Sequence, residues 1–133
     1  MAPFNVRQII LKISRNCSHI KDTFLNFAGN SGMMIIHKGY SDLSLNRPVV
    51  TMGVFDGVHL GHRMLLRRVV REAANTGSDS VAVTFDPHPR IVLTGDPAHL
   101  RFLTDIDERT DLLRDTGIGH LVIIPFTHEL SRM

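Results

Sequence analysis

The sequence of 133 residues has a single cysteine, Cys17, and no long run of apolar residues. One cysteine cannot form a disulfide within the chain, and it fits a reducing compartment such as the cytoplasm. No apolar run approaches the roughly 20 residues that a membrane-spanning helix needs. The composition, 43% hydrophobic and 21% charged, is typical of a soluble globular protein with one modest core. We therefore expect a cytoplasmic protein without a membrane partner.

Acidic side chains are scarce in the first 33 residues, where Asp22 stands against four lysines and arginines. The rest of the chain is close to neutral. Because a nucleic-acid-binding protein usually spreads basic residues over its folded part, we do not expect such a partner. We interpret residues 1–33 as a poorly ordered basic extension that results from translation at an upstream start codon, since Met33 and Met34 stand just before the domain pattern. A basic amphipathic helix, a leader peptide and a membrane-surface contact are the alternatives.

Residues 34–133 alternate between short apolar segments and helical patterns. Such alternation predicts an α/β fold with a parallel sheet, and burial on both faces explains the unbroken apolar strands. We expect three strands only, as though the second half of an α/β domain were missing. The expected strands are residues 47–55, 79–86 and 120–126, the helices are 62–77, 104 to about 117 and one beginning at 127, and a Pro- and Gly-rich connection spans 87–103.

Two details of these helices are predicted. Leu65, Val69 and Ala73 share one face of the first helix, with residues 66 and 70 beside it, and Gly77 is its expected stop. Thr104 is the expected N-cap of the second helix, whose first turn is acidic.

The junction "GVFDGVHLGH", residues 53–62, joins the first strand to the first helix. Gly53, Gly57 and Gly61 allow a tight turn and the close approach of a ligand. The helix N-terminus offers free N–H groups to a phosphate. His59 and His62 suit the stabilisation of charge on an α-phosphate and a departing pyrophosphate, without a protein nucleophile.

Other phosphate and metal motifs do not match this junction. It lacks the lysine of G-x-x-x-x-G-K-[ST], and its glycines are not in G-x-G-x-x-G order, which argues against a P-loop or a dinucleotide site. Zinc normally takes a third protein ligand, and no cysteine is near His59 and His62. We therefore predict a phosphate site and no protein-held metal.

Three segments resemble the bacterial FAD synthetases, bifunctional riboflavin kinase/FMN adenylyltransferases. "TMGVFDGVHLGHRMLL" (51–66) is similar to their first signature, and "HLGH" within it matches the H-x-G-H motif of the wider nucleotidyltransferase superfamily. "VTFDPHPRIVL" (83–93) resembles the second signature, and residues 103–133 resemble the segment that follows. Val54 departs mildly, since many members have a small polar residue there.

The resemblance implies a Rossmann-like domain that transfers AMP from ATP to FMN, with magnesium, giving FAD and pyrophosphate. It makes His59 and His62 the catalytic residues. The residues that it places at the nucleotide are Gly53, Phe55, Asp56, Gly57, His59, Gly61 and His62. Those that it places at the flavin are Phe85, Pro87, His88 and Pro89, where an aromatic ring and two prolines offer a flat apolar wall.

The later signatures of that family, G-x-D-F-x-F-G and S-S-T-x-I-R, and its riboflavin kinase domain have no counterpart in the sequence. The chain thus resembles only the N-terminal part of the adenylyltransferase module, and we expect it to be weak or inactive alone. Two alternatives stay open. One is another H-x-G-H enzyme acting on nicotinate mononucleotide, phosphopantetheine or glycerol phosphate. The other is a non-catalytic remnant whose exposed sheet edge pairs with another chain.

Basic residues outside the junction have two interpretations each. Arg63, Arg67 and Arg71 form a stripe at helical spacing, which is either a solvated face or a surface that steers phosphates. Arg90 is either an ordinary surface residue or a phosphate contact.

Overall fold

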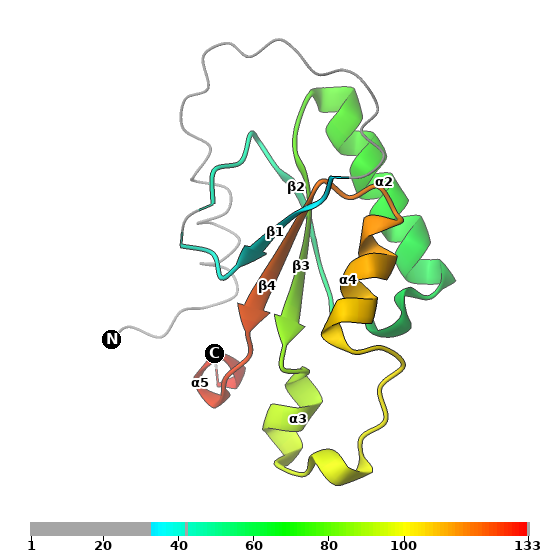
Figure 1. The fold of residues 1–133 in the computed structure, drawn as a ribbon. Helices are drawn as coiled ribbons and strands as arrows, with labels where there is room; N and C mark the ends of the chain where they lie inside the picture. Colours follow the sequence, from blue (N-terminus) through cyan, green and yellow to red (C-terminus); the bar gives the residue numbers. More distant parts are fainter. Residues whose placement is uncertain (1–32, 42, 133) are drawn as a thin grey trace.

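The computed structural model describes residues 33–41 and 43–132, so the predicted N-terminal extension lies outside the described residues except for Met33. Four strands form one parallel sheet in the order β1-β4-β3-β2 (Figure 1). The predicted parallel α/β architecture is confirmed. The strands are β1 (Ile35–Lys38), β2 (Val49–Met52), β3 (Ser80–Asp86) and β4 (His120–Pro125).

The expectation of three strands is wrong, because β1 forms a fourth at one edge of the sheet. It pairs with β4 alone, with Ile35 opposite His120. Ile35 and Ile36 are 51% and 41% exposed, so this strand carries neither a regular alternation nor a fully buried run. Four residues with that pattern give a weak strand signal, and pairing with a segment more than 80 residues away stabilises them.

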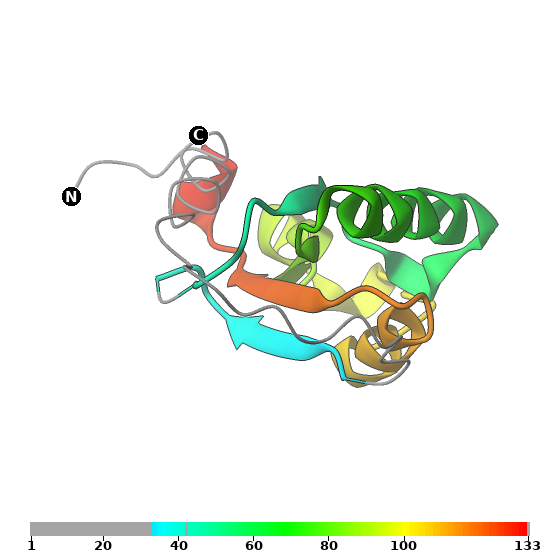
Figure 2. The same ribbon diagram turned by 90° about the horizontal axis from the view of Figure 1, so that it is seen from above.

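Helices α2 (Leu60–Thr76) and α4 (Ile106–Arg114) cover the same side of the sheet (Figure 2). Leu66 and Val69 of α2 and Leu113 of α4 pack there against Ala82 and Leu121. Consecutive right-handed crossovers that move along the sheet in one direction place their helices on one side. No helix in residues 33–41 and 43–132 is long and apolar enough to cross a membrane.

The other side of the sheet has its own core. Val81, Val83 and Phe85 of β3 pack with Val122 and Ile124 of β4, and Leu43 and Leu45 from the β1–β2 connection cover them. Strand β3 is therefore buried on both faces, which explains its unbroken apolar sequence.

Helix α2 begins two residues earlier than predicted, because His59 is its N-cap. Gly77 ends it in a left-handed conformation, as predicted. The buried face is shifted by one residue at its start: Leu66 is fully buried, whereas Leu65 is 44% exposed.

The segment between β3 and α4 is more regular than predicted. It holds α3 (Pro89–Thr94) and the short 3-10 helix η2 (Pro97–His99). The N-cap of α4 is Asp105, not Thr104: Asp105 and Glu108 form a reciprocal capping box, which satisfies two backbone N–H groups. The last expected helix is present as α5 (His128–Ser131).

Candidate functional site

The predicted nucleotide and flavin segments follow neighbouring parallel strands, so both begin at the same edge of the sheet. The Gly53 amide donates to the Val83 carbonyl (3.0 Å), which extends the β2–β3 pairing by one residue. The Thr84 hydroxyl donates to the Val54 carbonyl (3.0 Å). These bonds hold residues 53–62 beside residues 85–89, at the strand ends where α/β proteins bind ligands.

The turn after β2 has an unusual backbone. Phe55, Gly57 and Val58 all have positive φ angles, of 55°, 73° and 41°. Only glycine adopts this conformation readily, so Phe55 and Val58 are strained. A Cβ at Gly57 would lie 2.7 Å from Leu103 Cδ1. Glycine at position 57 therefore satisfies both the φ angle and the close approach of the 100–104 segment.

Asp56 ties this turn to the segment before α4. Its carboxylate accepts hydrogen bonds from the Leu103 and Thr104 amides and from the Thr104 hydroxyl. The Thr104 hydroxyl also accepts the Gly57 N–H (3.1 Å). Burial alone would raise the pKa of Asp56, but these donors outweigh it and lower that pKa. Asp56 thus holds the turn in place.

His59 and His62 are stacked, with ring centroids 3.5 Å apart and ring planes 19° from parallel. The His59 Nδ1 accepts the His62 backbone N–H (3.3 Å), so His59 carries its proton on Nε2. A Cβ at Gly61 would lie 3.2 Å from the His59 ring. A side chain at position 61 would thus crowd the exposed His59 ring, which caps the start of α2.

His62 is half-buried, and its ring and that of Phe55 meet edge to face, with centroids 5.3 Å apart. Its Nδ1 is buried and has no hydrogen-bond partner among the described residues. Burial and then the neighbouring His59 lower the pKa of His62, while Asp56 opposes them. The His62 ring is therefore held neutral more readily than a free imidazole, which leaves one N–H donor and one acceptor.

The four predicted flavin residues are not equally accessible. Phe85 is 8% exposed and packs edge-on against Phe126 in the core. Pro87 is exposed, and His88 and Pro89 are half-buried. Phe102 was not predicted as a site residue, yet its ring centroid lies 4.3 Å from that of His88. The accessible aromatic surface of this segment is thus the His88–Phe102 pair.

His88 also begins α3: its Nδ1 accepts the Arg90 N–H (3.1 Å). Burial, then the charge of Arg109, lower the pKa of His88, and Asp56 opposes them. Arg109 was not predicted as a site residue either. Apolar and hydroxyl side chains at 106, 110 and 113 mark the inner face of α4, and position 109 lies on that face.

The predicted arginine stripe on α2 divides in two. Arg67 and Arg71 are exposed. Arg63 is half-buried, and its Nε donates to the Val58 carbonyl (3.2 Å). Arg63 therefore supports the turn, whereas the other two present charge to solvent.

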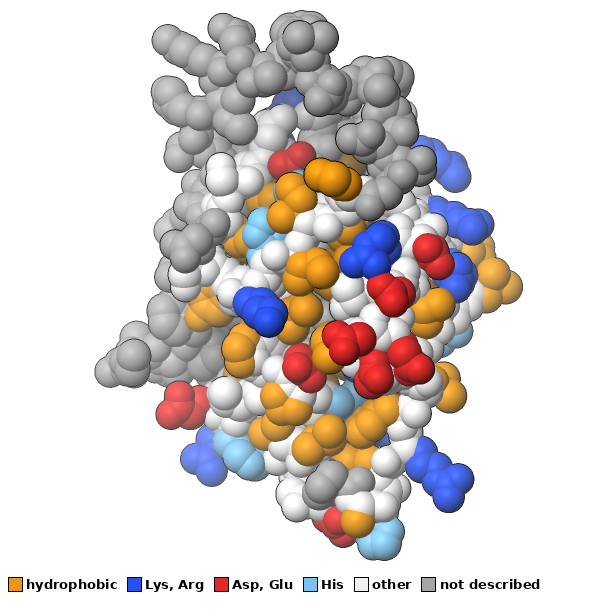
Figure 3. Space-filling model, in the orientation of Figure 1, with side chains coloured by type: hydrophobic (Ala, Val, Ile, Leu, Met, Phe, Trp, Pro, Cys, Tyr) orange, Lys and Arg blue, Asp and Glu red, His pale blue; other side chains and the backbone are white. Residues whose placement is uncertain are grey.

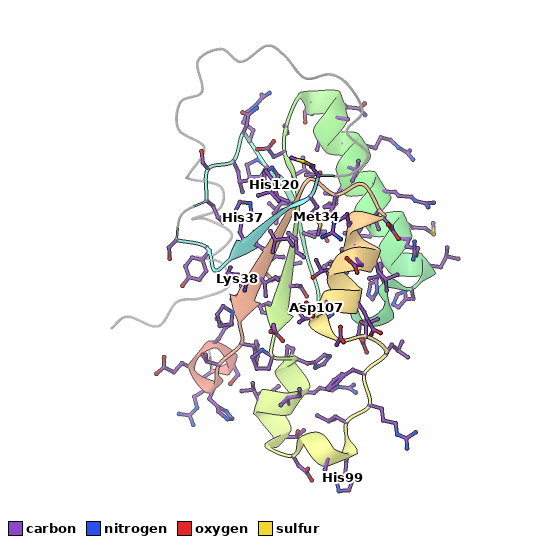
Figure 4. All side chains as sticks on the ribbon, in the orientation of Figure 1. Met34, His37, Lys38, His99, Asp107 and His120 are labelled. Carbon is purple, nitrogen blue, oxygen red and sulfur yellow. The ribbon has the colours of Figure 1, made fainter. Side chains whose placement is uncertain are left out.

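Three further histidines are labelled in Figure 4. His120 is the first residue of β4, His37 is the third residue of β1, and His99 lies on η2. Exposed acidic side chains gather over α4 (Figure 3); they are Asp105, Asp107, Glu108 and Asp111. The described part of the chain contains no group of three or more potential metal ligands.

A comparison with protein-family models identifies residues 42–133 as a match to FAD synthetase. The chain belongs to the FAD synthetase family. The match includes the turn after β2, the His59–His62 pair and the 85–89 segment, so the resemblance seen in the sequence is confirmed.

Curated relatives agree with this assignment. The chain is 43% identical over 85 residues to the bifunctional riboflavin kinase/FMN adenylyltransferase of Pseudomonas fluorescens and 31% identical over 85 residues to that of Listeria monocytogenes. These alignments cover 64% of this chain and 27% of each relative. A Geobacillus thermodenitrificans protein assigned to the same class is 39% identical over 93 residues, which is 70% of this chain and 50% of that protein.

The fold is also similar to a crystal structure of a macrolide-efflux protein from Streptococcus pneumoniae. The TM-score is 0.57 and the sequence identity 27%, over 73% of this chain and 34% of that one. The chain thus spans a quarter to a half of the length of the relatives that it matches, and its fold occurs within a larger protein.

Proposed function

We propose that residues 34–133 form the first part of an FMN adenylyltransferase domain, which transfers AMP from ATP to the phosphate of FMN. The observation that carries this proposal is the stacked His59–His62 pair at the start of α2, within the segment that matches FAD synthetase. Neighbouring strand ends place this pair and the 85–89 segment at one edge of the sheet.

The turn 53–62 suits the phosphates of ATP in this proposal. The His59 Nε2–H is free of the capping bond that occupies Nδ1, and a neutral His62 has a ring donor of its own. Both histidines lie at the start of α2, whose free N–H groups attract anions. Imidazole donors at that point would stabilise the negative charge that develops on the α-phosphate and on the leaving pyrophosphate.

The 85–89 segment suits the flavin. Pro87, the half-buried Pro89 and the His88–Phe102 pair offer a partly apolar, rigid surface, which matches a planar ring system. Phe85 would support this surface from the core rather than contact the flavin directly.

The reaction needs no protein nucleophile. An oxygen of the FMN phosphate attacks the α-phosphorus of ATP and forms the new P–O bond. The bond from that phosphorus to the bridging oxygen of the β-phosphate breaks, and pyrophosphate leaves with the electron pair. The protein contributes alignment and charge stabilisation, which together account for most phosphoryl-transfer catalysis.

A magnesium ion carried by the ATP phosphates would lower their charge. The carboxylate of the turn, Asp56, already accepts hydrogen bonds from Leu103 and Thr104. Mg²⁺ commonly keeps several waters and takes few protein ligands beside substrate phosphates. A turn with a single carboxylate, already hydrogen-bonded, therefore fits an ion that arrives bound to ATP.

The test is binding of each substrate to the purified chain, followed by an assay of FAD formation. We expect quenching of FMN fluorescence and heat of binding for Mg–ATP in calorimetry, with slow turnover by the chain alone. A chain that binds Mg–ATP but leaves FMN fluorescence unchanged favours another H-x-G-H nucleotidyltransferase. A chain that binds neither would end the proposal.

A further inference from the structure

Arg109 lies on the inner face of α4 and is 3% exposed. Its guanidinium is charged at any pH that the protein meets. No carboxylate of the described residues forms an ion pair with it. A buried charge without a close partner is costly, and apolar residues of similar size are often as stable at such positions. Stability alone therefore gives no reason for an arginine at this place.

The contacts of Arg109 join the two candidate segments. Its Nη1 donates to the Phe85 carbonyl (3.2 Å) and to the Thr84 hydroxyl (3.4 Å). The same hydroxyl donates to the Val54 carbonyl (3.0 Å). One guanidinium thus fixes the end of β3 and, through a single hydroxyl, the backbone at the start of the turn after β2.

The Arg109 guanidinium is only partly satisfied, because its Nε is buried without a hydrogen-bond partner among the described residues. Burial lowers the pKa of Arg109, and Asp56, Asp86 and Asp105 act against that effect through longer-range attraction. The charge of Arg109 also lowers the pKa of His88, as does that of Arg90, whereas the charge of Asp56 raises it.

We propose that Arg109 is a positioning residue, whose buried guanidinium holds the segment after β3 and the turn after β2 in one fixed arrangement. This inference rests on the proposed function, in which those two segments hold the acceptor and the nucleotide. Small displacements between reacting groups cost much of an alignment effect, so an anchor shared by both segments would set the distance from the FMN phosphate to the α-phosphate.

The test compares Arg109→Met, Arg109→Lys and a control, Arg114→Met, which removes the same charge from the far end of the same helix. In the protein without substrates, we expect Arg109→Met to shift the amide resonances of residues 54–58 and 85–90. We also expect it to raise the pKa of His88, measured by NMR titration, because a nearby cation is lost. Arg109→Lys keeps the charge and should leave the pKa of His88 close to its value in the unsubstituted protein. The amide resonances should still shift, because lysine lacks the planar fork of arginine.

Substrate binding gives a second readout. We expect Arg109→Met to weaken FMN binding about tenfold, as for the loss of a charged hydrogen bond, and Arg114→Met to leave it unchanged. Unaltered resonances and His88 titration in Arg109→Met, or equal changes in Arg114→Met, would overturn the inference. If Arg109→Met does not fold, Arg109→Gln, which keeps a donor without the charge, is measured instead. Failure of the normal chain to bind either substrate would end the proposed function, whereas the spectra still decide the role of Arg109.

Discussion

Two pairs of histidines lie at opposite ends of the same sheet, and they are built differently. At the carboxyl ends of the strands, His59 and His62 stack face to face at 3.5 Å, and their side chains are not hydrogen-bonded to each other. At the amino end of β4, the His120 Nδ1 shares a hydrogen bond of 3.1 Å with the His37 Nε2 of the neighbouring strand. Neither ring of the first pair uses a nitrogen on the other ring, which leaves nitrogens for a ligand, whereas in the second pair one nitrogen of each ring bonds the other ring.

The amino-end pair is also anchored to the fold. The His120 Nε2 lies 3.8 Å from an oxygen of Asp79, whose other oxygen accepts the Asn46 N–H. The His120 side chain is only 14% exposed. This chain of contacts links β1, β4 and the approach to β3, so its histidines serve the structure. The comparison shows that the partners of a histidine, more than its burial, distinguish a candidate catalytic pair from a structural one.

The largest effect expected from this difference is on catalysis. His62→Ala should lower the rate of FAD formation about 100-fold, by loss of a donor to the developing phosphate charge, without a comparable loss of stability. His37→Ala should lower stability and leave substrate binding intact. Steady-state assays and urea unfolding of both variants check this contrast. Equal losses of activity in the two variants would remove the distinction between the pairs.

Of the two pairs, only the one at the carboxyl ends of the strands could be predicted from the sequence. The glycines and histidines of residues 53–62 are close together in the chain, so local spacing shows both the turn and the pair. His37 and His120 are 83 residues apart, and only the pairing of β1 with β4 brings them together. No local pattern identifies a contact of that kind.

The same reason explains which contacts within the site the sequence could not show. The Asp56 carboxylate binds the backbone nearly 50 residues later. Arg109 reaches back to Thr84 and Phe85. Phe102 meets His88 across the α3 segment. Motif residues are predictable, whereas the residues that hold them depend on the tertiary fold.

The next largest effect tests the crowded turn at Gly57 against an open position with a similar φ angle. Gly57→Ala should lower the free energy of unfolding by about 2 kcal/mol, because alanine is strained at φ +73° and its Cβ would meet Leu103. Gly95→Ala is the control: φ is +65° there, but nothing lies within 4 Å of an added Cβ. Urea unfolding should show a smaller loss for the control. Equal losses would mean that Leu103 moves aside freely.

A smaller effect distinguishes Thr104, the predicted N-cap of α4, from Asp105, the N-cap in the structure. Asp105→Ala should cost about 1 kcal/mol of stability through loss of the capping box, with little effect on Mg–ATP affinity. Thr104→Ala removes the hydroxyl that bonds Gly57 and Asp56, so it should weaken Mg–ATP binding as well. Unfolding and calorimetry on both variants make the comparison. An unchanged affinity in Thr104→Ala would show that the turn keeps its shape without this hydroxyl.

The last comparison is a slope of stability with pH, to which both pairs contribute. Burial, with His120, lowers the pKa of His37, and burial, with His59, lowers that of His62. The unfolded chain therefore binds protons at a higher pH than the folded one. The stability that these neutral histidines contribute should be fully present above pH 6.5, the ordinary pKa of histidine. It should be lost as the pH drops through their pKa values in the folded protein. His88 contributes with the same sign in every variant.

Asparagine variants assign this slope to each pair. Both His37→Asn and His62→Asn should flatten the fall in the free energy of unfolding between pH 8 and pH 5, measured by urea titration. Only His37→Asn should also lower stability at pH 8, because it breaks the bond to His120, whereas the buried His62 Nδ1 has no partner to lose among the described residues. A loss at pH 8 in His62→Asn alone would reverse the roles given to the two ends of the sheet.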